Sequence, residues 1–231
     1  MDWFSEKWQI INSLSPFLMD GLWKTFEVSS VAIMLGSILG AILGIIKTLD
    51  SKSLKLVINI YVHLFRGTPY LVQIYIIYFV LPSLGIAWLQ FDSYTAAIVS
   101  LSLYTASYVT AIVAAAIDSI PAGQEEAARS VGMTKAQALY HVIVPQAIKL
   151  TVPPMASIYV IVIKSTAVLS VIGVAELTRQ GETSILRMPG DTMFIYGLIA
   201  VLYFIYCYPV LRFASWAERK MKTSGSPQEL A

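Results

Sequence analysis

Residues 124–145 read Gln-Glu-Glu-Ala-Ala-Arg-Ser-Val-Gly-Met-Thr-Lys-Ala-Gln-Ala-Leu-Tyr-His-Val-Ile-Val-Pro, a short polar island between two hydrophobic regions. The region before it, 94–117, contains no charged residue, and the region after it, 150–175, contains Lys164 alone. At about 1.5 Å per residue, helices of this length can cross a hydrocarbon core of about 30 Å. The island therefore predicts a membrane protein in which two spans are joined by a structured polar loop.

The composition supports a membrane protein and argues against other classes. Of the 231 residues, 57% are hydrophobic and 13% are charged, whereas about a quarter of the residues in soluble proteins are charged. A net charge of +2, spread over several loops, does not indicate a nucleic-acid partner. The single cysteine, Cys207, lies in an apolar run and excludes both a disulfide framework and a thiolate metal site within this chain.

Five hydrophobic segments suit membrane-crossing helices, so the predicted fold class is all-α and polytopic. They are residues 28–46, 56–81, 94–117, 150–175 and 193–211. In the first segment, small residues recur every four positions and share a face on which another helix can approach closely. These small residues are Ala32, Gly36, Gly40 and Gly44.

The second segment carries a break. Gly67-Thr68-Pro69 follows Arg66, and proline both lacks a backbone donor and disfavours helical geometry in the residue before it. Such interruptions occur in membranes where the backbone is buried in protein or lines water. We therefore expect a broken helix, with Arg66 facing protein or water.

The distribution of basic residues predicts the orientation. Lysine and arginine follow the first and fifth segments and accompany the polar island, whereas loop 82–93 has none and loop 176–192 has two. The positive-inside rule then places the island and the C-terminus in the cytoplasm and the N-terminus outside. The predicted organisation has three parts: an extracytoplasmic amphipathic lead-in at 1–20, a transmembrane domain at 21–215, and a cytoplasmic tail at 216–231.

The polar island has the signals of a helical hairpin at about 121–146. Pro121 can begin a helix, and Gly132 can end it in a left-handed conformation. Thr134 and Gln137 have the spacing of a capping box for a second helix, which we expect Pro145 to end.

One face of this hairpin is suited to a protein partner. Ala127 and Ala128 offer a small-residue surface that can enter a groove, while Glu126 and Arg129 can fix its orientation through charge-assisted hydrogen bonds. Such a hairpin can transmit the movement of a partner to the spans. The alternative is an ordinary capped connection between two helices.

Three segments, 66–73, 123–132 and 170–180, resemble the polar amino acid permease family of bacterial ABC importers, and the island resembles its EAA loop. The resemblance implies the type I importer (MetI-like) permease fold in the bacterial inner membrane, with the loop as the docking element for an ATPase. The coupling residues it implies are Glu125, Glu126, Ala127, Ala128, Arg129, Gly132 and Pro145.

The resemblance also implies several partners: two ABC ATPase subunits, a second permease that is identical or related, and an external solute-binding protein. No Gly-Lys-Ser or Gly-Lys-Thr phosphate loop occurs in the chain. We therefore expect no cofactor on this chain, ATP and Mg²⁺ on the partner ATPase, and no enzymatic activity of its own.

A solute pathway is predicted from polar residues in the spans. The candidates are Arg66, Thr68, Gln73, Tyr104, Ser107, Tyr108, Lys164, Ser165 and Thr166. The sequence departs from the family here: Tyr108 is followed by Ala111 and Ala114 where relatives commonly carry Glu and Arg, and Ser165 replaces an acidic residue. The missing carboxylates argue against a purely cationic substrate, unless a related partner permease keeps them.

Lys164 is open to two interpretations. It can meet a substrate carboxylate or support the gate, or it can pair with a backbone carbonyl or a partner subunit. The hydroxyls of the third span likewise suit either a polar path or hydrogen bonds between helices.

A second function class is an ATP-independent channel or secondary transporter for small polar solutes. Such carriers typically show broken helices in matching positions and acidic residues at the membrane midplane, whereas this sequence has one broken span and no midplane carboxylate. An intramembrane enzyme is not indicated, because His63 and His141 stand alone and far apart in the sequence.

Overall fold

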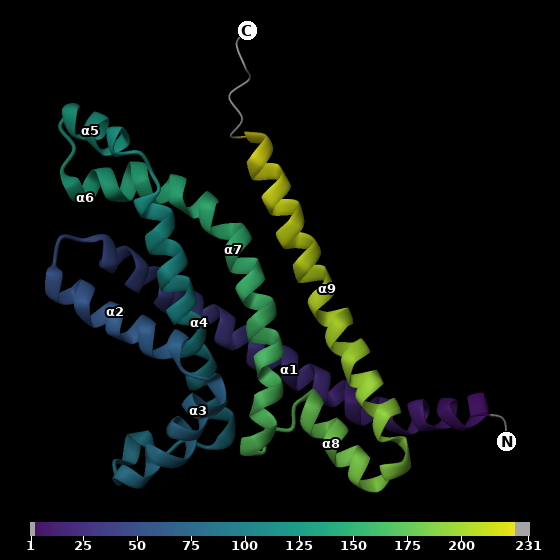
Figure 1. The fold of residues 1–231 in the computed structure, drawn as a ribbon. Coiled ribbons are helices and arrows are strands. Elements are labelled where there is room, and N and C mark those ends of the chain that lie inside the picture. The colour runs from purple at the N-terminus through teal and green to yellow at the C-terminus, as the bar shows by residue number, and fades with distance from the viewer. Residues whose placement is uncertain (1–2, 225–231) are drawn as a thin grey trace. The chain divides into compact units, whose positions relative to one another are not determined.

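The computed structural model describes residues 3–224, and every regular element among them is a helix or a helical turn (Figure 1). This confirms the all-α prediction. The α-helices are α1 (Trp3–Thr48), α2 (Lys52–Gly67), α3 (Tyr70–Tyr75), α4 (Ser93–Asp118), α5 (Ala122–Ser130), α6 (Lys135–Ala138), α7 (Val144–Ser165), α8 (Leu177–Arg187) and α9 (Thr192–Ser224). Shorter 3₁₀ turns cover Pro82–Leu84, Ala87–Leu89, Thr166–Ile172 and Pro189–Asp191, and π-helical turns cover Ile76–Val80 and Leu139–Ile143.

Among the described residues, four helices are long and apolar enough to cross a membrane, or five when the pair around residue 68 counts as one broken span. This agrees with the five predicted segments. The helix of the third span, α4, differs from the predicted range by one residue at each end. The predicted break is also confirmed, because α2 ends at Gly67 and both Thr68 and Pro69 are extended, with ψ of 148° and 136°.

The predicted lead-in at 1–20 does not form a separate element. Helix α1 runs for 46 residues from Trp3 through Pro16 into the first span. Pro16 has no N–H to donate to the carbonyl of Asn12, four residues earlier. The Ser15 hydroxyl donates to that carbonyl instead, at 3.2 Å, and so satisfies the acceptor that the proline leaves open.

The prediction that Pro145 ends the second hairpin helix is wrong. The chain stays helical from Lys135 to Ile172, and Pro145 is the second residue of α7, with its side chain exposed. A π-helical turn, Leu139–Ile143, precedes the proline, and Val144 N–H donates to Leu139 O across it. A π turn shifts the backbone hydrogen bonds by one residue, from the carbonyl four positions back to the one five positions back. The helix can therefore continue although Pro145 has no N–H to donate.

The helices are divided between two compact units, each described here on its own. The first contains the described residues up to Met34, together with Pro69–Ser102 and Ile161–Tyr208. Its core packs the N-terminal part of α1 against α8 and the start of α9, through residues at helical spacing (Figure 1). The buried residues of this core are Ile10, Leu14, Leu18, Leu177, Ile195 and Ile199.

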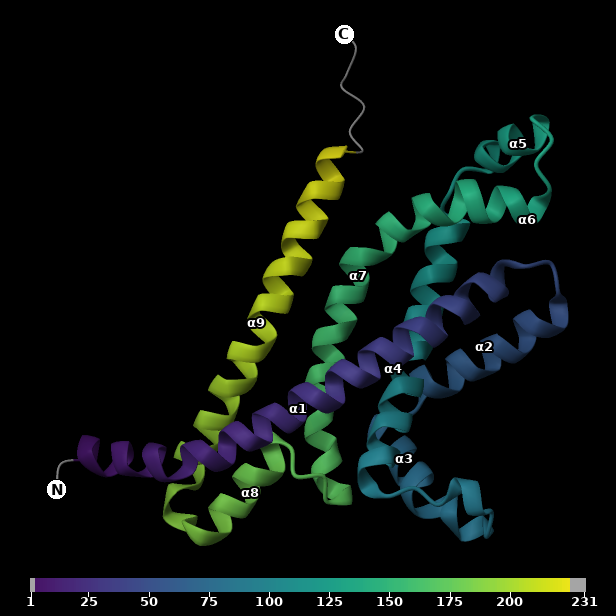
Figure 2. The ribbon, with the colours of Figure 1, turned by 180° about the vertical axis from the view of Figure 1, so that it is seen from behind.

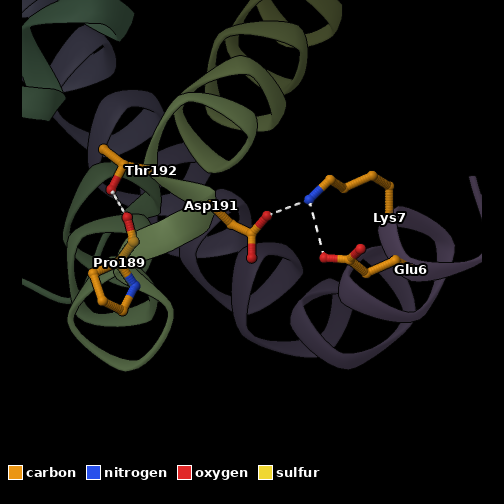
Figure 3. A network of polar contacts seen from close by, with 5 residues as sticks. All are labelled: Glu6, Lys7, Pro189, Asp191 and Thr192. Atoms are coloured by element: carbon orange, nitrogen blue, oxygen red, sulfur yellow. Dashed lines mark hydrogen bonds and ion pairs between the residues drawn. The ribbon is translucent and has the colours of Figure 1, made fainter. Parts of the chain in front are cut away.

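An ion pair joins the ends of the first unit's elements. Lys7 Nζ lies 2.5 Å from Asp191 Oδ1 and 3.4 Å from Glu6 Oε1 (Figure 3). Asp191 lies in the turn between α8 and α9, where the Thr192 hydroxyl donates to Pro189 O at 2.8 Å. The beginning of α1 is thereby tied to the beginning of α9.

The second unit contains Leu35–Thr68, Leu103–Val160 and the described residues from Pro209 onward. Here the small-residue face of α1 meets another helix, as predicted, and that helix is α4. A Cβ atom on Gly40 would lie 2.6 Å from Val109 Cβ, and one on Gly44 would lie 2.7 Å from Val113 Cβ. The unit is also joined by two tyrosines: the Tyr61 hydroxyl donates to Leu103 O at 2.6 Å, and the Ser37 and Tyr159 hydroxyls lie 2.8 Å apart.

Candidate functional site

The polar island folds into the predicted helical hairpin. Helix α5 follows the N-cap Pro121, and the chain turns at Gly132, which has a φ of +90°. Across this turn Gly132 N–H donates to Arg129 O and Met133 N–H donates to Ala128 O, at 3.0 and 3.3 Å. The turn therefore requires glycine for its backbone conformation.

The second arm of the hairpin begins at the predicted capping box. Gln137 N–H donates to Thr134 Oγ1 at 3.3 Å, and Thr134 N–H donates to Gln137 Oε1 at 2.8 Å. Helices α5 and α6 lie side by side in both views of the ribbon (Figure 1, Figure 2). The Gln146 amide donates to Gln124 Oε1 at 3.2 Å and so connects the start of α7 back to α5.

The two alanines of the EAA segment lie on different faces of α5. Ala128 is buried within the chain, whereas Ala127 is exposed beside Glu126 and Arg129, and Glu125 is half-buried. The expectation that both alanines form one partner surface is therefore corrected. Ala128 packs the hairpin itself, because successive positions on a helix point about 100° apart, and only Ala127 is available to another protein.

Two apolar residues of the hairpin are strongly exposed and were not predicted as site residues. Val131 is 75% exposed next to the turn, and Tyr140 is 71% exposed on the π-helical turn. Single exposed apolar side chains are common on protein surfaces, so these two are candidates for the contact surface only through their place on the hairpin. Their apolar character within an otherwise polar island was the signal in the sequence.

An exposed ion pair connects the hairpin to the turn between α1 and α2. Lys135 Nζ lies 2.5 Å from Asp50 Oδ2, in the turn between α1 and α2. This hydrogen bond lowers the pKa of the Asp50 carboxyl from its ordinary value. A cavity of about 460 Å³ lies behind the hairpin, and its lining includes Leu49, Ile117, Ile120, Ala122, Leu139 and Ile143.

Among the predicted pathway residues, one group of aromatic and basic side chains comes together in the second unit. The Arg66 guanidinium lies 5.1 Å from the ring centre of Tyr108, within the range of a cation–π contact. The Tyr104 hydroxyl donates to that of Tyr108 at 3.3 Å. Arg66 is otherwise exposed, so its environment in a membrane span stays a prediction.

Two hydroxyls of the same unit are engaged in local hydrogen bonds. The buried Ser107 hydroxyl donates to Tyr104 O at 2.7 Å, and the Thr68 hydroxyl donates to Leu64 O at 2.7 Å. The arrangement of Ser107 favours a role in helix packing over one in lining a path.

The remaining pathway candidates belong to the first unit. Gln73 is buried on α3. Lys164 is exposed near the end of α7, Ser165 is half-buried, and Thr166 is buried at the start of the following 3₁₀ turn. The two hydroxyls donate to carbonyls of the preceding turn, at 2.9 and 2.7 Å, which leaves Lys164 as the exposed polar group of this segment.

Several apolar spans, two of which are joined by an exposed polar hairpin, define the class as a multi-pass membrane protein. Residues 32–223 match the family described as "Binding-protein-dependent transport system inner membrane component". The chain belongs to this family of inner-membrane proteins.

Similar proteins agree with this assignment. The chain is 33% identical to the L-cystine transport system permease protein TcyB of Bacillus subtilis over 202 residues, covering 87% of this chain and 85% of the relative. It is 32% identical to the glutamine transport system permease protein GlnP of Escherichia coli over 215 residues, covering 93% and 97%.

Two solved structures are similar in fold. A chain from a crystal structure of an amino acid ABC transporter with histidines matches with a TM-score of 0.82 and 33% identity, over 95% of this chain and 99% of that one. A chain of the inward-facing MetNI methionine ABC transporter matches with a TM-score of 0.66 at 20% identity, over 89% and 98%. The second likeness extends the shared fold beyond close sequence similarity.

Proposed function

We propose that this chain is the membrane-spanning permease subunit of an ABC importer that moves a polar amino acid or an amino-acid-like solute into the cytoplasm. The observation that carries the proposal is the coupling hairpin, with its left-handed Gly132 and exposed Glu126-Ala127 edge, in a chain of this family. ATP hydrolysis takes place on a separate subunit, and this chain is the gate that the hydrolysis drives.

The proposed assembly has two permeases, identical or related, two ABC ATPases that hold ATP and Mg²⁺, and an extracytoplasmic solute-binding protein. The hairpin lies in the cytoplasm and the N-terminus outside, in agreement with the basic residues around the hairpin. The similarity to amino acid permeases along most of the chain supports the substrate class.

The hairpin is suited to transmit movement because it is stiff and exposed on one side. Its two arms are fixed by the turn at Gly132 and by the capping box of Thr134, and an exposed ion pair between Asp50 and Lys135 links it to the turn between α1 and α2. Glu126, Ala127 and Val131 remain available to the ATPase. A movement of the ATPase then reaches α4 and α7, between which the hairpin is inserted.

Replacing Glu126 with lysine is expected to reduce co-purification of the cognate ATPase about tenfold, because a hydrogen bond to a charged group contributes about 1.5–3 kcal/mol. The measurement is the ratio of ATPase to permease after affinity purification in mild detergent. Glu218→Lys, a charge reversal at another exposed glutamate, on α9, is the matched control and should keep the ratio of the native protein. Equal ratios for the two variants would remove Glu126 from the coupling surface.

Reconstitution distinguishes the proposed importer from the alternative, an ATP-independent channel or secondary transporter. Proteoliposomes that contain the permease alone should not accumulate a radiolabelled amino-acid mixture. Those that also contain the ATPase, internal ATP and the external binding protein should accumulate it. Accumulation by the permease alone would contradict the proposed importer.

We place Lys164 in the solute pathway, supported by its exposure in the middle of an otherwise uncharged segment. A cation there requires protein, water or an anionic solute group as its environment. Lys164→Met is expected to lower uptake about tenfold at equal membrane expression, by the loss of a charge-assisted contact. Lys164→Arg is the control and should keep part of the activity; full uptake by the methionine variant would exclude Lys164 from the mechanism.

A further inference from the structure

A fully buried carboxylate follows the segment that carries Lys164. Glu176 has no exposed surface and lies outside the candidate spans, between Ile172 and Pro189. It is the N-cap of α8, where its Oε2 accepts from Thr178 N–H at 2.9 Å and its Oε1 from Arg179 N–H at 2.8 Å. Burial raises the pKa of the Glu176 carboxyl above its ordinary value, while these hydrogen bonds act in the opposite direction.

A helix cap alone does not account for a glutamate at this position. Serine, threonine, asparagine and aspartate are the preferred N-cap residues, because their short side chains reach the first N–H groups. Glutamate is one methylene longer than aspartate, and here the longer side chain has a partner beyond the cap. Its Oε2 also accepts a hydrogen bond from the Tyr203 hydroxyl of α9, at 2.9 Å.

Tyr203 connects this carboxylate to the predicted pathway. Its hydroxyl oxygen lies 3.2 Å from Thr178 Oγ1 and 3.3 Å from Thr166 Oγ1. Thr166 is the residue with which the 3₁₀ turn begins, two positions after Lys164. One hydroxyl group therefore joins α8, α9 and the 3₁₀ turn that follows α7.

The carboxylate of Glu176 determines which group receives the hydroxyl proton of Tyr203. Tyr203 has a single hydroxyl proton, and the carboxylate is the strongest acceptor within its reach. Its oxygen then faces the two threonine hydroxyls as an acceptor. Thr178 can donate to it at 3.2 Å, whereas the Thr166 proton points mainly to Ile163 O at 2.7 Å and is shared with Tyr203 at 3.3 Å. Glu176 thus fixes the orientation of the Tyr203 O–H group, with its oxygen toward Thr166. Without the carboxylate the tyrosine hydroxyl is free to turn.

The same cap is joined to α1. Leu177 N–H donates to Thr25 Oγ1 at 3.2 Å, and both Thr25 and Leu177 are fully buried. A Cβ on Gly21 would lie 2.8 Å from Leu177 Cα, so α1 and the start of α8 approach backbone to backbone. The start of α8 is therefore a fixed support, against which Tyr203 can hold Thr166.

Building on the proposed function, we propose that Glu176 and Tyr203 are positioning residues of the solute pathway, which hold Thr166, and with it Lys164, in place against α8 and α9. Glu176 has no surface with which to touch a solute. Its influence on transport passes through Tyr203 and Thr166.

The test uses the complete complex in proteoliposomes, with ATPase, binding protein and a radiolabelled amino-acid mixture. Tyr203→Phe removes the hydroxyl alone and is expected to lower the maximal uptake rate about tenfold. Glu176→Asp keeps the α8 cap but withdraws the carboxylate from Tyr203, and should cause a similar loss. Tyr206→Phe is the matched control, because Tyr206 lies on the same helix as Tyr203 and its hydroxyl is 2.9 Å from the Ser29 hydroxyl of α1. This variant should retain native uptake.

Three further measurements decide between positioning and simple stabilisation. For a positioning pair, the double variant should fall no more than about twofold below either single variant. The thermal midpoint of the Tyr203→Phe complex should match that of Tyr206→Phe, and ATPase activity without solute should be native. The inference is overturned if Tyr203→Phe transports as well as Tyr206→Phe, or if its loss of uptake comes with an equal loss of assembled complex. Failure of the native complex to take up solute would instead overturn the proposed function.

Discussion

Gly132→Val is expected to abolish ATP-driven uptake while the protein still inserts into the membrane at native levels. Gly132 has a φ of +90°, and a left-handed conformation costs a residue with a Cβ about 1–2 kcal/mol, more when it is β-branched. No atom lies within 4 Å of the added Cβ, so the effect acts through the backbone and not through a clash. The turn between α5 and α6 has to open, and the hydrogen bonds from Gly132 and Met133 N–H groups are lost.

The consequence is specific for coupling because the turn orients both arms of the hairpin. Gly123→Val is the control, since Gly123 lies in the first turn of α5, has no positive φ, and has open space at its Cβ. Membrane level by immunoblot, co-purified ATPase and uptake are the measurements. Native uptake by Gly132→Val would show that the geometry of this turn does not transmit the movement of the ATPase.

The parts of the fold that depend on local chemistry could be predicted from the sequence. The break at Thr68-Pro69, the left-handed turn at Gly132 and the capping box at Thr134 each follow from the backbone preferences of a few adjacent residues. The ends of α4 follow from the length of an uncharged run. In each case the deciding residues are neighbours in sequence, so no knowledge of packing was needed.

Features that depend on distant or compensating groups could not be predicted in the same way. Pro16 and Pro145 are both helix-breaking signals, yet a serine hydroxyl and a π-helical turn allow the helix to continue through them. The orientation of Ala127 and Ala128 depends on which face of α5 packs inward. Periodicity within a nine-residue helix does not decide that.

The role of Glu176 could not be predicted from the sequence for the same reason. The sequence places it in an external loop, and its capping of α8 can be recognised only with the helix in view. Its partners come from three other segments: Tyr203, Thr166 through Tyr203, and Thr25 through Leu177 N–H. Hydrogen-bond partners so far apart in sequence are determined by tertiary packing, which cannot be read from a single sequence.

The second large effect is expected at the contact between α1 and α4. Gly40→Leu should greatly reduce the amount of folded permease. The first carbon of the new side chain would lie 2.6 Å from Val109 Cβ and 2.8 Å from Ala106 O. The carbonyl oxygen belongs to the backbone of α4 and cannot turn aside, so the two helices have to separate. Overpacking of a filled interior costs about 1–3 kcal/mol, and a leucine at a backbone contact lies at the upper end of that range or beyond.

Separation of these helices also spoils the neighbouring contact, because Gly44 meets Val113 and Thr110 O one turn further along. The loss should therefore be cooperative: a lower thermal midpoint in detergent, a lower yield from membranes, and an uptake that falls with the yield. Gly197→Leu is the matched control, since Gly197 lies within α9 and has no atom within 4 Å of an added Cβ. Equal thermal midpoints for the two variants would mean that α1 and α4 do not depend on close backbone approach, and the small-residue face would lose its explanation.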